Sequence, residues 1–171
     1  MHFTRPVRYL YINPMRFFTI TQYFNKLQSV LFILLIVPLL VFTALYFFMS
    51  DIAPLPQKEY YIVIPLTVLL EWLLAVIIFN KKIKSARNEQ GLGAKLDKYF
   101  GITILRYGFL SSASLILAAG FFLSGNDIFT TLYLAGLVFT GILWPTTRKV
   151  SNDLRLRGDE REMVYFKKDN F

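Results

Sequence analysis

Four long runs of apolar residues dominate this chain of 171 residues. They cover 27–50, 60–80, 99–126 and 128–147, and the charged side chains within them are Glu71 and Arg106. A helix needs about 20 residues to cross the roughly 30 Å hydrocarbon core of a bilayer, and each run is at least that long. The sequence therefore predicts an all-α integral membrane protein: a single membrane domain forming a four-helix bundle, with spans at 27–49, 60–80, 99–123 and 127–146.

The connections between the spans predict how the helices pair. Residues 50–59 join the first two spans and residues 124–126 join the last two. Connections this short favour antiparallel neighbours, so we expect two helical hairpins. Between them, 81–98 is expected to be a basic cytoplasmic elbow, in which the second helix continues to Ser85 or Arg87, breaks at 91–93 and resumes near Ala94.

The positive charges predict the orientation of the chain. Of its 19 Lys and Arg residues, 17 lie before the first span, in the elbow or after the fourth span. The connection between the first two spans holds Lys58 alone. Because cytoplasmic segments retain positive charge, we expect both termini in the cytoplasm and a multi-pass protein of the plasma (inner) membrane.

Residues 1–26 are expected to be a cytoplasmic or interfacial segment. Asn13 and Pro14 have the residue types that start a helix, and the apolar positions that follow share one face. We expect an interfacial helix on the cytoplasmic leaflet. The alternative is a simple cytoplasmic extension of the first span.

Residues 147–171 are expected to form a short cytoplasmic tail. Its helix is predicted to begin at Ser151 or Asn152, and the tail either docks on the cytoplasmic loops or another protein, or remains a solvated extension. Basic and aromatic residues on this side of the membrane are expected to contact anionic headgroups or protein partners. These candidates are Arg16, Lys81, Lys82, Lys84, Arg155, Arg157, Arg161, Tyr165 and Phe166.

Glu71 and Arg106 are the candidate functional residues inside the spans. An ionisable side chain near the bilayer centre costs a few kcal/mol unless it is paired or hydrated. Counted from the cytoplasmic ends of their spans, both lie at a depth of roughly 12 to 14 Å, so the geometry allows an ion pair between them.

Three interpretations of these two residues stay open. The pair locks the register of the second and third helices, or it serves as a proton-coupling or ligand-binding element of a transporter. In the third interpretation, Arg106 extends to the cytoplasmic headgroups and Glu71 pairs with another subunit.

Small residues on the last two spans predict close helix packing. Gly108 with Ser112, and Ser114 with Ala118, have the spacing of a small-xxx-small motif. Packing within the short second hairpin is favoured, and a homodimer face is the alternative. The predicted packing positions are Gly108, Ser112, Ser114, Ala118, Gly136 and Gly141.

The residues of common catalytic sites are scarce in this chain. It has no Cys and a single His, His2. Thiol chemistry, His-based metal binding and His-containing triads therefore lack their residues, and we expect no catalytic residue, metal or cofactor. The mixed charge of the tail argues against nucleic acid as a partner.

Three functional hypotheses remain. We favour a non-catalytic accessory or scaffold subunit of a membrane complex. The alternatives are a small oligomeric transporter or channel that uses Glu71 and, with least support, a lipid-modifying membrane enzyme. The expected partners are anionic lipid headgroups and either other membrane subunits or further copies of the chain.

Overall fold

The computed structural model describes residues 19–48 and 59–168, and the regular structure in these segments is helical. Three of the helices are long and apolar enough to cross a membrane, and the bent pair α4 and α5 would make a fourth span. The all-α class and the several apolar spans are thus as predicted. The helices are α1 (Ile20–Phe48), α2 (Tyr60–Arg87), α3 (Leu92–Ser124), α4 (Asp127–Ile142), α5 (Thr147–Asp153) and α6 (Gly158–Phe166).

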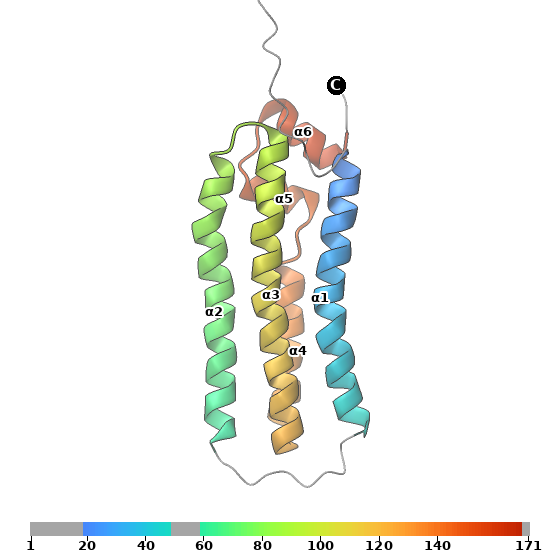
Figure 1. Ribbon diagram of the computed structural model, residues 1–171, viewed down its shortest axis with the longest axis vertical. Helices are drawn as coiled ribbons and strands as arrows, with labels where there is room; N and C mark the ends of the chain where they lie inside the picture. Colours follow the sequence, from blue (N-terminus) through green and yellow to red (C-terminus); the bar gives the residue numbers. More distant parts are fainter. Residues whose placement is uncertain (1–18, 49–58, 169–171) are drawn as a thin grey trace, which may run out of the picture.

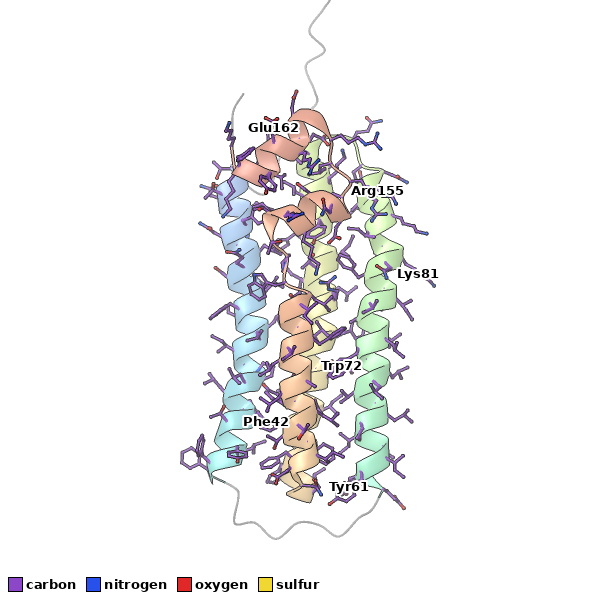
Figure 2. The ribbon with its side chains drawn as sticks, turned by 180° about the vertical axis from the view of Figure 1, so that it is seen from behind. Phe42, Tyr61, Trp72, Lys81, Arg155 and Glu162 are labelled. Atoms are coloured by element: carbon purple, nitrogen blue, oxygen red, sulfur yellow. The ribbon has the colours of Figure 1, made fainter. Side chains whose placement is uncertain are left out.

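Helix α3 is the centre of the arrangement. It packs against α2, α1 and α4, and its contact with α2 is the most extensive. Figure 1 shows α1 and α2 on opposite sides of α3, and Figure 2 shows α4 lying between the same two helices on the other face. The predicted first hairpin is therefore wrong as a packing unit, since α1 and α2 are antiparallel but separated. A ten-residue connection does not force the helices that it joins into contact.

The connection between α2 and α3 lies at residues 88–91, whereas the break was predicted at 91–93. Helix α2 ends at Arg87, and α3 begins at Leu92, two residues earlier than expected. Gly91 precedes α3 with φ 86°, in the left-handed region where a side chain would be strained. Most of 81–98 is helical, so the elbow consists of two helix ends joined by four residues.

Helix α4 is shorter than the predicted span 127–146. Its 16 residues end at Ile142, and α5 turns away from it by 74°. The break lies at Pro145, which lacks an amide hydrogen and disfavours helix at the residue before it. Thr146 then starts α5, because its hydroxyl oxygen accepts a hydrogen bond from the amide of Lys149 at 3.3 Å.

The start of α1 bears on the predicted interfacial helix. Residues 20–26 continue without a break into the apolar part of α1, as in the alternative of a simple extension. Asn13, Pro14 and Arg16 lie outside the described residues.

The C-terminal segment folds back on the helix ends. Helices α5 and α6 cover the N-terminal ends of α1 and α3 and the C-terminal end of α2 (Figure 1), which we call the capped end. The predicted helix start at Ser151 or Asn152 is wrong, because α5 already includes both residues and ends at Asp153. Leu154 and Leu156, which follow, are buried.

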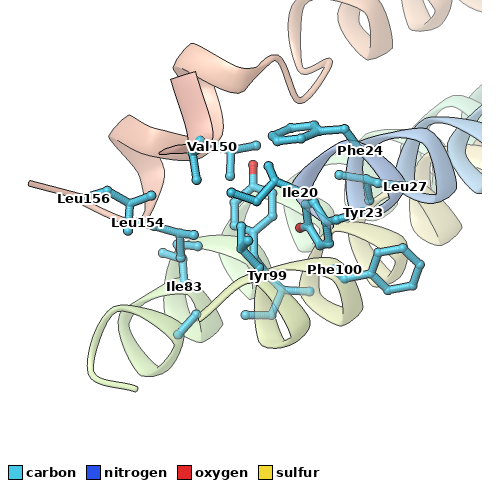
Figure 3. Close-up of a cluster of buried hydrophobic side chains, with 14 of the residues drawn as sticks. Ile20, Tyr23, Phe24, Leu27, Ile83, Tyr99, Phe100, Val150, Leu154 and Leu156 are labelled. Atoms are coloured by element: carbon cyan, nitrogen blue, oxygen red, sulfur yellow. The ribbon is translucent and has the colours of Figure 1, made fainter. Parts of the chain in front are cut away.

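A cluster of apolar side chains joins the tail to the helices beneath it (Figure 3). Burying an aliphatic or aromatic side chain contributes about 1.5 to 3 kcal/mol, so several such contacts hold the tail firmly. The docked tail, one of the two predicted alternatives, is therefore the one found. The labelled members are Ile20, Tyr23, Phe24, Leu27, Ile83, Tyr99, Phe100, Val150, Leu154 and Leu156.

A second cluster fills the opposite end of the helices. Phe42 of α1 stacks on Tyr133 of α4 with ring centroids 4.1 Å apart, and Phe121 of α3 lies against the same Phe42 ring. The outward faces of α1, α2 and α4 stay apolar and exposed, as at Leu40, where 63% of the residue is accessible. Such faces suit contact with lipid chains.

Candidate functional site

Glu71 lies at the interface of α2 and α3, close to the molecular surface. It is partly exposed, and its neighbours Leu70 and Leu73 are exposed apolar residues. Its carboxylate accepts a hydrogen bond from the hydroxyl of Ser112 on α3. The same hydroxyl also lies 3.0 Å from the backbone oxygen of Phe109, so two acceptors share one donor.

Arg106, in contrast, is buried within the helices. Its Nη2 donates to the backbone oxygen of Leu143 at 2.6 Å, and the guanidinium lies 4.1 Å from the centre of the Phe79 ring. Its Nε has no hydrogen-bond partner among the described residues. A hydrogen bond and a cation–π contact thus hold the side chain in place.

Glu71 and Arg106 do not form the ion pair that their depths in the spans allowed. In the described parts of the chain, the ion pairs are Lys95 with Glu160 and Lys98 with Glu89. Arg106 precedes Ser112, the partner of Glu71, by six residues, which is about 9 Å along α3.

The direction of the side chains widens this separation. Helical side chains lean toward the N-terminus of their own helix, and α2 and α3 are antiparallel. Arg106 therefore leans toward the capped end, where Phe79 lies, and Glu71 leans toward the opposite end. Counting depth from the ends of the apolar runs missed both this divergence and the register of the two helices.

Two cations hold the C-terminal end of α4. Besides Arg106 on the oxygen of Leu143, Lys149 donates from Nζ to the backbone oxygen of Ile142 at 2.8 Å. These carbonyls have no partner within the helix, and the helix dipole makes this end negative, so cations stabilise it. The buried arginine therefore has a structural task at the break between α4 and α5.

The predicted packing glycines divide into two groups. A Cβ on Gly136 would lie 3.0 Å from the Trp72 ring of α2, so this glycine permits close approach of α4 to α2, whereas the favoured prediction was packing between the last two spans. Gly108 and Gly141 were assigned to packing within the chain, and this is wrong, because a Cβ on either would meet no atom within 4 Å.

The other predicted packing positions have mixed roles. Ala118 is buried at 1% exposure, whereas the Ser114 hydroxyl donates to the Leu110 backbone oxygen of its own helix. Ser112 binds Glu71 as described. The tightest position is Gly120, where a Cβ would lie 2.7 Å from the Phe129 ring. The space at Gly120 is limited by Phe129 of the next helix, and the sequence pattern along α3 does not show this contact.

Polar contacts fasten the tail to the ends of α2 and α3. Arg87 donates from Nε to the Asp153 backbone oxygen at 2.6 Å, and the Tyr99 hydroxyl donates to the Asp153 carboxylate at 3.0 Å. Lys95 pairs with Glu160 at 2.7 Å. None of these partners was predicted, because residues more than 50 positions apart meet only after the helices have packed.

Basic and aromatic candidates in the described segments gather around the capped end. Figure 2 places Lys81 and Arg155 in this part of the molecule. All are exposed, so they are available to headgroups or proteins. They are Lys81, Lys82, Lys84, Arg155, Arg157, Arg161, Tyr165 and Phe166.

One small cavity lies in the described part of the chain near Tyr107, the neighbour of Arg106. This cavity of about 10 Å³ lies between α1, α3 and α4, lined by Pro38, Ser111, Ser114, Thr140 and others but not by Glu71. That volume is about enough for one water molecule. In the described segments, no group of three or more His, Cys, Asp or Glu residues could hold a metal ion.

Comparison with protein families, with curated proteins and with solved structures finds no match to this chain.

Proposed function

We propose that this protein is a non-catalytic subunit of a membrane complex, which contacts another membrane protein through the surface near Glu71. The observation that carries this proposal is the position of that residue. Glu71 is a partly exposed carboxylate among apolar side chains, and Ser112 is its one hydrogen-bond donor among the described residues.

The energetics of a lipid-facing carboxylate support this proposal. An acidic side chain near the middle of a membrane costs about 2.5 to 3.5 kcal/mol, and one hydroxyl leaves most of its acceptor sites unused. Contact with a second protein would remove the group from lipid and supply the missing donors. Arg106, which also lies in an apolar span, already has partners within the chain.

The proposal also includes orientation and lipid contacts. We place the capped end in the cytoplasm at the plasma (inner) membrane, because the exposed basic residues around it would remain on that side. Their charge suits anionic headgroups.

Purification of the tagged full chain from its native membrane in mild detergent tests this proposal. Native mass spectrometry is expected to find a second membrane chain in fixed stoichiometry. A lone chain, or an assembly of identical copies, would contradict the proposal.

A further inference from the structure

We infer that the outer face of α2 and α3 beside Glu71 binds a transmembrane helix of another protein that carries a Lys or Arg at the depth of Glu71. This inference rests on the proposed function and adds the binding face and the chemistry of the partner. It follows from charge, from the shape of the face and from the position of the other cation in the spans.

Charge defines what the partner must present. The Glu71 carboxylate has about four acceptor sites, and the structure supplies one shared hydroxyl. A Lys or Arg in a facing helix would donate to the remaining sites and offset the negative charge in a region without water. Apolar partner side chains alone would leave the carboxylate unpaired.

The shape of the face allows a helix to approach closely. Gly101, Gly108, Ser112 and Ala119 are separated by seven, four and seven residues, so they line one face of α3. That face is the outward one, since a Cβ on Gly101 or Gly108 would meet no atom within 4 Å. A second backbone can therefore come near α3, with the Glu71 carboxylate at its side.

A second copy of this chain does not supply the required charge. A symmetric pair would use the same face on both copies and bring two Glu71 carboxylates together. Arg106, which lies within the apolar part of α3, is about 9 Å along that helix from the partner of Glu71, and it is buried and bound to the Leu143 oxygen, so it cannot reach across. The occupant is therefore a different chain.

A reconstituted system tests the inference directly. The chain has no Cys, so Asn88→Cys on the exposed turn between α2 and α3 gives one site for a donor dye. The probe is an acceptor-labelled peptide of about 20 leucine and alanine residues with one central Lys, in phosphatidylcholine vesicles, compared with the same peptide carrying a central Leu. Energy transfer should show about tenfold tighter binding of the Lys peptide.

Three variants locate the interaction. Glu71→Gln should abolish the preference for Lys, while its amide oxygen still accepts from Ser112. Gly108→Leu should block binding by filling the outward face of α3. Gly141→Leu is the matched control on α4, because this glycine is equally open, and it should leave binding unchanged.

Each contrary outcome has a definite meaning. The inference would be overturned if the Lys and Leu peptides bind equally or if neither binds. It would also be overturned if both glycine variants lose binding equally, or if labelled copies of the chain associate with one another in place of the peptide. Unchanged helix content and thermal unfolding of Glu71→Gln are expected, so loss of binding reports on the face. If the native complex survives in Glu71→Gln, the proposed function stands and this inference fails.

Discussion

The two charged residues within the apolar spans, Arg106 and Glu71, lie in different surroundings. Arg106 is surrounded by protein, with a backbone oxygen and an aromatic ring as partners. Glu71 lies near the surface with a hydroxyl from Ser112. Because the two side chains lean toward opposite ends of antiparallel helices, their environments are independent.

This independence predicts additive effects of substitution. Arg106→Gln should lower the free energy of unfolding by roughly 2 to 4 kcal/mol, because a charge-assisted hydrogen bond and a cation–π contact are lost. Glu71→Gln should change it little, since its amide oxygen still accepts from Ser112. The double variant should equal the sum within about 0.5 kcal/mol.

Unfolding in mixed detergent and dodecyl sulfate micelles measures all four members of this cycle. A coupling well above that limit would mean that the two groups interact after all.

At the scale of helices, the sequence is informative where a local residue type decides the structure. The two glycines of segment 91–93 predicted a break between α2 and α3, and the structure has it at residues 88–91. The end of α4 was missed, because the apolar run continues through Leu143 and Trp144 and hydropathy ignores the Pro145 break. The docking of the tail was left open, since it depends on buried residues such as Leu154 that are isolated in the sequence.

The docked tail leads to a prediction at this scale. Val164→Asp should release α6, because Val164 is fully buried and an unpaired charge there costs about 3 kcal/mol or more. Trypsin should then cleave after Arg157 and Arg161 faster than in the unaltered chain.

Tyr165→Asp is the matched control, because Tyr165 is the next residue after Val164 and is 46% exposed. Cleavage at the same rate in both variants would show that α6 does not depend on the buried contact.

For the molecule as a whole, hydropathy was sufficient to predict the helical class and the several apolar spans. It could not predict which helices are neighbours. The central place of α3 follows from side-chain fit, such as Gly120 of α3 against Phe129 of α4, and from the contact of the Phe121 ring of α3 with Phe42 of α1. The face of α3 that bears Gly108 was assigned to packing within the chain for the same reason. A small residue allows another helix to approach, but it does not determine which helix does so.

The charge distribution predicts a single orientation for the whole molecule. A membrane-impermeant thiol reagent should label Asn88→Cys from the cytoplasmic side of intact vesicles and Glu59→Cys from the other side. Both residues are exposed and lie at opposite ends of α2. Labelling of both from one side would contradict the topology.

The brevity of α4 has a consequence for the surrounding bilayer. At 16 residues it is about 24 Å long, some 6 Å less than a typical hydrocarbon layer. Either the bilayer becomes thinner beside this helix, or the Leu143–Thr146 turn lies within the hydrocarbon layer, where neighbouring helices separate it from lipid. In the first case the bilayer is deformed on one side of the protein only, and a thinner membrane accommodates the protein with less deformation.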